Sequence, residues 1–307
     1  MLLHEDREVF NNVINYVHNY IPYVHMSFIE KDYYVFMLLK GISKNPEAMF
    51  KGGTSIVKGW KIEDRFSEDI DINLLPEIES TDSHRTKLCD CCEDAIRSLG
   101  LSWTDEVRHR REFNRFTVPY NPIFANKSLK MELQIEEVAH KRTKVRNTTY
   151  TVLCISNYIW NVLNRSQLIN RLYEFELEPF SMPVQNMDVT FVEKCLSLAN
   201  KYLEGVDLRV GRHLYDIYCM MTRGNLLSFD LNYAIAATKQ CLVESKRDIC
   251  LRQKESFKTI LLRSLYSDFY MKDYNISLMS MKIKQDGVTY EMCKEAIIRL
   301  VTSLNDF

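Results

Sequence analysis

Asp69 and Asp71 are the residues whose type and spacing most directly suggest chemistry. They lie in residues 69–74, Asp-Ile-Asp-Ile-Asn-Leu, which alternate polar and apolar side chains as a half-buried strand does. Residues two apart in a strand point to the same face, so the two carboxylates lie side by side. Such carboxylates repel one another unless a cation separates them, and hard oxygen ligands favour Mg²⁺. The pattern predicts metal ligands, although a solvated strand edge can carry the same short motif.

A second candidate feature, Gly52-Gly53-Thr54-Ser55, precedes the aspartates. Paired glycines let a backbone approach a phosphate closely, and the amides that open a following helix supply oriented donors. Thr54 and Ser55 add hydroxyl groups. Residues 56–68 are enough for a short helix and a return into the aspartate strand, which would turn the glycines toward the carboxylates. The alternative is an ordinary strand-to-helix turn with a Ser/Thr cap.

Mixed helical and strand patterns surround these residues, and the last part of the chain is almost wholly helical. Apolar spacing predicts a helix over 6–20, and Ser27 with Glu30 predicts a capping box that starts a second helix. We also expect a helix over 83–99, strands over 101–109, 113–119 and 129–138, and helices over 190–204, 209–222, 228–243, 247–268 and 288–304. Pro179 and Pro183 mark the boundary. The prediction is an α+β domain with a mixed or antiparallel sheet over residues 1–183, then an α-helical domain over 184–307.

Composition is that of an ordinary globular protein. The 307 residues carry 40 basic and 41 acidic side chains, so no global field draws the chain to a polyanion. The nine cysteines show no metal-site spacing and suit a reducing compartment. We expect a cytoplasmic protein without a signal peptide or membrane span.

Several motifs together resemble the AbiEii/AbiGii-type nucleotidyltransferase toxins of the DNA polymerase β-like superfamily. The matching segments are Phe50–Ser55 with Lys58, Arg65–Ile72, Glu30–Val35, Phe191–Lys194 and Arg212–Tyr218. They occur in order over about two-thirds of the chain, which is more specific than any one motif.

The resemblance implies a polymerase β-like fold and a metal site of one or two Mg²⁺ ions. A third carboxylate on a neighbouring strand would complete that site. Glu132 is our candidate, because Met131 and Leu133 would face the core, and Glu136 and Glu137 are its competitors.

The resemblance also implies a nucleotide site. The nucleotide-binding candidates are Gly52, Gly53, Thr54, Ser55, Ser67 and Lys194. Thr190 and Glu193 predict a capping box that puts Lys194 in the first turn of its helix, where a cation opposes the helix dipole unless it faces an anion. Lys194 would contact the β/γ-phosphates, with Asp216 beside it.

The implied reaction is transfer of a nucleotidyl group from an NTP to an acceptor hydroxyl, with release of pyrophosphate. The resemblance further implies a toxin of a toxin–antitoxin or phage-defence system with a cognate antitoxin, and tRNA or another RNA as acceptor. Two basic stretches, residues 108–115 (Arg108 to Arg115) and 141–146 (Lys141 to Arg146), could carry such an acceptor or form a solvated hairpin. The alternatives are an enzyme that transfers a nucleotidyl or phosphoryl group to a partner protein, and a nucleotide-binding module without turnover.

Overall fold

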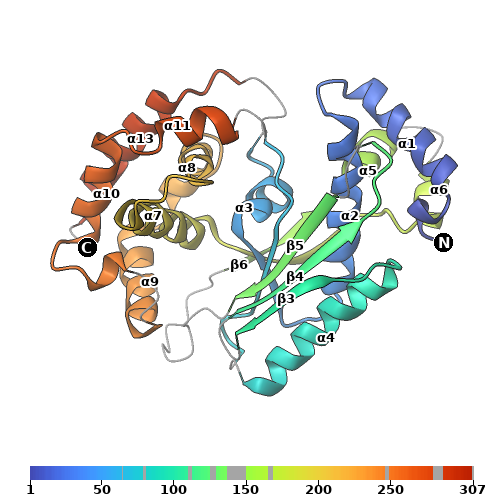
Figure 1. Ribbon diagram of the computed structural model, residues 1–307, viewed down its shortest axis with the longest axis horizontal. Coiled ribbons are helices and arrows are strands. Elements are labelled where there is room, and N and C mark those ends of the chain that lie inside the picture. Colours follow the sequence, from blue (N-terminus) through green and yellow to red (C-terminus); the bar gives the residue numbers. More distant parts are fainter. Residues whose placement is uncertain are drawn as a thin grey trace. The chain divides into compact units, whose positions relative to one another are not determined.

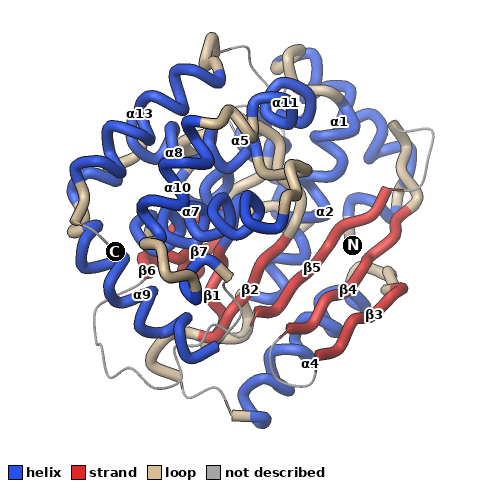
Figure 2. The backbone as a smooth tube through the Cα atoms, turned by 60° about the vertical axis from the view of Figure 1, so that its left-hand side comes forward, coloured by secondary structure: helices blue, strands red, loops and turns tan. Residues whose placement is uncertain are grey.

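The aspartate segment forms strand β2 (Ile70–Leu74) in the computed structural model, inside a mixed sheet. Among the described residues the strand order is β3-β4-β5-β2-β1-β7-β6, which Figure 2 shows in red. β2 pairs antiparallel with β1 and parallel with β5, and β5 pairs antiparallel with β4. The other strands are β1 (Ala48–Lys51), β3 (Thr104–His109), β4 (Phe113–Tyr120), β5 (Leu129–Glu136), β6 (Tyr150–Ile155) and β7 (Phe180–Gln185). The predicted α+β class is confirmed.

The structure describes residues 1–63, 65–78, 81–109, 113–124, 129–136, 150–164, 169–245, 249–278 and 286–305. By contacts the chain divides into two compact units. The first comprises Met1–Gly59, Phe66–Glu137 and Tyr150–Val184, and the second comprises Trp60–Arg65 and Gln185–Phe307, as far as the chain is described.

The first unit also contains six helices among its described residues, which pack against its sheet or against one another. They are α1 (Arg7–Tyr20), α2 (Met26–Ile42), α3 (Gly52–Ser55), α4 (Asp82–Ser98), α5 (Tyr158–Leu163) and α6 (Ile169–Glu174), and a π-helical turn, Ile56–Trp60, follows α3. α4 contacts β2 and packs along α2 (Figure 1). Ile70 and Ile72 are fully buried, as the alternating pattern predicted, and Phe116 and Val118 of β4 are also fully buried.

The start of α2 differs from the predicted capping box. The helix begins at Met26, and the ring of His25, not the hydroxyl of Ser27, caps it by accepting the Ser27 amide at 3.2 Å. Glu30 is wholly buried, and its carboxylate accepts the amides of Ile123 and Phe124 at 2.7 and 3.1 Å. The Ser27–Glu30 interpretation was therefore wrong, because a long-range contact claims the glutamate.

The second unit is helical in its described residues after β7. Its elements are α7 (Met187–Glu204), α8 (Gly211–Thr222), α9 (Leu231–Ser245), α10 (Phe257–Tyr266), α11 (Met271–Asp273) and α13 (Tyr290–Ser303), with short turns Leu226–Ser228, Cys250–Arg252 and Tyr274–Leu278. α7 packs against α8, α9 and α10, and α8 packs against α13. No helix in the described part of the chain is long and apolar enough to cross a membrane.

The predicted position of Lys194 in its helix was wrong. α7 begins at Met187, so Lys194 lies about two turns inside it. The Thr190 hydroxyl donates to the Asn186 carbonyl at 3.1 Å, and Glu193 accepts from Gln185 Nε2 at 2.9 Å. These bonds use the side chains that the capping-box pattern had assigned to the helix end. Lys194 therefore does not oppose the helix N-terminus.

Candidate functional site

The Gly52 turn and the Asp71 carboxylate lie against each other. Register pairs Lys51 of β1 with Asp71 of β2, and Gly52 follows with a φ of +75°. A Cβ added to Gly52 would lie 1.9 Å from Asp71 Oδ2. Only glycine fits here, because it tolerates the left-handed backbone and leaves room for the carboxylate. The predicted approach of the glycine turn to the aspartate pair is present in the structure.

Hydroxyl groups tie this turn to the start of the aspartate strand. Thr54 Oγ1 lies 2.8 Å from Ser67 Oγ and also donates to the Asp69 carbonyl. Ser55 Oγ donates to the Gly52 carbonyl at 2.8 Å. All three hydroxyl side chains are buried. They shape the turn, so its backbone is the surface left for a phosphate.

Strand register places the third carboxylate candidate next to the aspartates. Leu133 of β5 pairs with Ile70, so position 132 is the neighbour of Asp69 along the sheet. Position 136 lies farther along β5, level with Asn73, and Glu137 lies outside the described residues. Position 132 is thus better placed than 136 to complete a carboxylate set with Asp69. Two half-exposed aspartates with a neighbouring glutamate position fit a divalent cation such as Mg²⁺.

Three consecutive charged residues at the start of α2 hold segments around this site. The first is Glu30, whose contacts are given above. The second, Lys31, forms an ion pair with Glu68, the residue before Asp69. Asp32 Oδ1 accepts from Lys58 Nζ at 2.5 Å, and Asp32 Oδ2 accepts the first amide of α5 at 3.0 Å. All three α2 side chains are buried. The segment that resembles the family helix therefore braces the site and the π-helical turn behind it.

A buried ion cluster in the second unit contains the other two catalytic candidates. Asp216 is fully buried and accepts from Arg65 Nε at 2.6 Å and from Arg65 Nη2 at 3.0 Å. Lys194 Nζ donates to Asp216 Oδ2 at 2.5 Å and lies 3.4 Å from His213 Nδ1. Glu63 Oε2 is 3.1 Å from Arg65 Nε. The structure thus brings Lys194 and Asp216 together, as expected.

Burial sets the charges in this cluster. Desolvation and the nearby Asp216 charge raise the pKa of Glu63 well above its usual range. Burial alone would raise the pKa of Asp216, but Arg65 and Lys194 outweigh it and hold that pKa well below its usual range. Desolvation and the Lys194 cation lower the pKa of His213 to about 4. Two cations, Arg65 and Lys194, thus share the carboxylate of Asp216.

Arg65 and Glu63 are the residues of this cluster to which sequence reasoning gave no role. Arg65 was part of the family pattern, but its mostly charged and polar sequence neighbours gave no sign that its side chain is buried. Glu63 carries no such sign. Its carboxylate accepts no hydrogen bond among the described residues.

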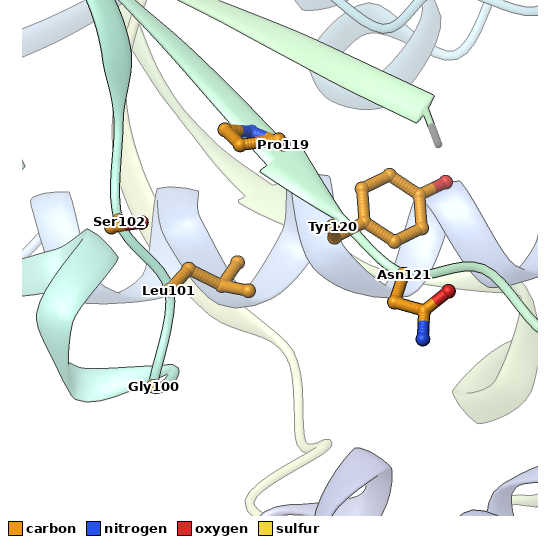
Figure 3. A pocket seen from close by; sticks show the side chains of 6 residues that line it. All are labelled: Gly100, Leu101, Ser102, Pro119, Tyr120 and Asn121. Atoms are coloured by element: carbon orange, nitrogen blue, oxygen red, sulfur yellow. The ribbon is translucent and has the colours of Figure 1, made fainter. Parts of the chain in front are cut away.

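A pocket of about 410 Å³ lies elsewhere in the first unit, where the α4–β3 connection passes the end of β4 (Figure 3). Gly100, Leu101 and Ser102 line one side, and Pro119, Tyr120 and Asn121 line the other. None of the candidate site residues lines it. We assign it no part in the chemistry.

The basic stretches are described only in part. Residues 108 and 109 end β3 and residues 113–115 begin β4, while 110–112 and the whole of 141–146 lie outside the described residues. Of the basic side chains in these stretches, the structure describes that of Arg115.

Comparison with known proteins decides the family. The nucleotidyl transferase AbiEii toxin family, a type IV toxin–antitoxin system, matches residues 38–283. The chain belongs to this family. It is a nucleotidyltransferase of the toxin class, as the resemblance implied, and the AbiEii membership implies an antitoxin partner. No curated protein matches the chain.

The MenT4 toxin is a solved structure with a similar fold. The nucleotidyltransferase toxin MenT4 from Mycobacterium tuberculosis H37Rv matches with a TM-score of 0.55 at 17% identity, over 90% of this chain and 86% of that one. JHP933 from Helicobacter pylori matches with a TM-score of 0.38 at 18% identity, over 78% of this chain and 92% of that one. The MenT4 likeness shows a shared fold.

Proposed function

We propose that this AbiEii-family protein transfers a nucleoside monophosphate from an NTP to a hydroxyl group of RNA, with tRNA as acceptor, in a reaction that depends on Mg²⁺. The observation that carries the proposal is the contact of the Asp71 carboxylate with the backbone of Gly52. It puts a metal-ligand candidate beside a turn residue that has no side chain of its own. A metal-bound triphosphate needs both at once.

Each residue of the first unit has a proposed role. Asp69 and Asp71 hold the metal, and Glu132 completes the set and takes the proton of the acceptor hydroxyl. Gly52 and Gly53, with the backbone of Thr54 and Ser55, accommodate the phosphates, and Ser67 holds the turn through Thr54.

The chemistry is an in-line displacement at the α-phosphorus. A bond forms between the acceptor oxygen and the α-phosphorus while the bond to the β-phosphate oxygen breaks, and pyrophosphate leaves. One or two Mg²⁺ ions, when bound, supply Lewis acidity at the attacking and leaving oxygens. The residues of the chain contribute position and charge, which are the main terms in such reactions.

Lys194 is proposed to neutralise charge on the β- and γ-phosphates. Its support is the buried cluster in which Asp216 orients the two cations Lys194 and Arg65. Arg65 is also followed directly by the segment that leads into Asp69. Asp216 is therefore proposed as a positioning residue, since its oxygens are already occupied by two cations.

Incubation with each labelled NTP, Mg²⁺ and total tRNA tests the proposal. Label should enter tRNA with the wild-type protein, and chelation of Mg²⁺ should stop it. An Asp69→Asn/Asp71→Asn variant should lose at least about 100-fold in rate, as for the loss of other groups that stabilise transition-state charge. Equal labelling by the two proteins would refute the assigned site.

Mass spectrometry of a co-expressed partner protein tests the acceptor class. A nucleotide-mass adduct on that protein, with no label in tRNA, would replace RNA by protein as acceptor. A phosphate-mass adduct would replace nucleotidyl transfer by phosphoryl transfer. Tight NTP binding without pyrophosphate release would point to a module without turnover.

A further inference from the structure

The register of the sheet places Arg115 in the same row as Asp71. Asp71 of β2 pairs with Gln134 of β5, and Gln134 pairs with Arg115 of β4. Directly opposed residues in a sheet point to the same face. The backbones of Asp71 and Arg115 are thus two strand spacings apart, about 10 Å.

Arg115 lies on the face of β4 that points away from α4. Asn114, the neighbour of Arg115, points the other way and donates to Cys89 Sγ of α4 at 2.8 Å. Phe116, the residue after Arg115, is fully buried. It lies on the same side of β4 as Asn114, which is the side that faces α4. Arg115 therefore lies on the opposite face, with the aspartates.

The side chain of Arg115 has a hydrogen-bond donor that the described residues do not satisfy. Its Nε is buried yet has no hydrogen-bond partner in the described part of the chain, and its side chain is only partly exposed. A guanidinium is always charged and offers donors in a fork that matches two oxygens of a phosphate. An anion on this face would satisfy the unmet donor.

The strand order separates the two sides of the reaction. β1, which ends at the Gly52 turn, flanks β2 on one side, whereas β5 and then β4 flank it on the other. In-line displacement puts the leaving pyrophosphate and the attacking hydroxyl on opposite sides of the α-phosphorus. If the triphosphate lies at the Gly52 turn, the acceptor approaches Asp71 from the β4 side, where Arg115 lies.

We propose that Arg115 binds a phosphodiester group of the acceptor strand, next to the hydroxyl that attacks. This inference rests on the proposed function and deepens it, because it makes the acceptor a nucleic acid and not a protein hydroxyl. Arg115 holds the acceptor and takes no part in binding the NTP.

Two measurements on Arg115→Ala test the inference. The first is the affinity for total tRNA in the absence of NTP, measured by filter binding at several salt concentrations. We expect affinity to fall about ten-fold or more, the worth of a charged hydrogen bond, and the salt dependence to lose about one ion. The second is the labelling assay, in which KM for tRNA should rise while KM for NTP stays unchanged.

Arg97→Ala is the matched control, because Arg97 is an exposed arginine of α4 paired with Glu93. It should bind tRNA as the wild type does. Arg115→Lys keeps the charge without the fork and should fall between wild type and Arg115→Ala. If thermal unfolding shows that Arg115→Ala does not fold, Arg115→Lys takes its place in both measurements.

Unchanged tRNA affinity in folded Arg115 variants, or a raised KM for NTP alone, would overturn the inference. The binding arm is independent of turnover, so failure of the proposed function leaves it interpretable. Asp69→Asn/Asp71→Asn should lose transfer but keep tRNA binding. Arg115→Ala should instead lose tRNA affinity and keep its KM for NTP.

Discussion

Gly52→Ala should have two consequences: it strains the backbone of the turn, and it displaces the carboxylate of Asp71. The new methyl group must adopt a φ of +75°, which costs an L-residue about 1–2 kcal/mol. It must also displace a carboxylate oxygen that would lie 1.9 Å away, and an off-rotamer side chain costs about 0.5–1.5 kcal/mol. We expect the free energy of unfolding to fall by about 2–3 kcal/mol, measured by urea denaturation.

The effect on catalysis should be larger than the effect on stability. Displacing Asp71 misplaces a proposed metal ligand, and an error of about 1 Å at a reacting centre can cost about 100-fold in rate. Labelled-NTP transfer at saturating tRNA should therefore fall about 100-fold, with recovery in part at high Mg²⁺.

Gly100→Ala is the control. Gly100 has a φ of +65°, but no atom lies within 4 Å of an added Cβ. This variant should lose only the backbone term in stability and keep wild-type transfer. If Gly52→Ala also keeps wild-type transfer while unfolding like Gly100→Ala, the assignment of Asp71 and the turn to one site is refuted.

Three further predictions concern the buried charges. Asp216→Asn leaves Arg65 and Lys194 without their counter-ion, so unfolding by denaturant should become easier by about 3–5 kcal/mol, and an unchanged midpoint would contradict the ion cluster. Burial keeps His213 neutral with a pKa of about 4 against 6.5 in the unfolded chain, so the free energy of unfolding should fall as pH drops from about 6.5 to 4. In His213→Gln this drop in the free energy of unfolding should be smaller by up to about 3 kcal/mol. If the variant and the wild type show the same dependence on pH, His213 is excluded as its source. Asp32→Ala leaves a buried ammonium and the first amide of α5 unpaired, so it should destabilise by about 3–5 kcal/mol, which thermal unfolding would detect.

Local patterns predicted the parts of the site that short segments build. The alternation around Asp69 and Asp71 predicted β2, because burial of one face leaves a period of two in the sequence. The approach of Gly52 to Asp71 followed from the short segment between them. Apolar spacing also predicted helices of the second unit, but the predicted helix over 247–268 was too long. α10 begins at Phe257, where the Ser256 hydroxyl caps it by accepting the Thr259 amide.

Contacts between distant residues could not be predicted in this way. Arg65 and Asp216 are 151 positions apart, and no local pattern links them. The capping-box pattern at Thr190 misplaced the start of α7, because a threonine inside a helix can donate to the carbonyl four residues earlier. The register that puts Arg115 level with Asp71 depends on how three strands align, which the alternation within each strand leaves open.

The three buried charges of α2 bear on when this toxin can become active during synthesis. Glu30 waits for amides 93 and 94 positions later, and Asp32 for one 126 positions later. A nascent or truncated chain that stops before Ile123 lacks the partners of Glu30, and one that stops before α5 lacks the α5 amide that Asp32 accepts. Burial of a carboxylate without its hydrogen-bond donors is unfavourable, which disfavours the packed form of α2 in such a chain. The brace behind the aspartates is thus complete only after about half of the chain has been made. We therefore expect a fragment that ends before α5 to show no nucleotidyl transfer in the labelled-NTP assay.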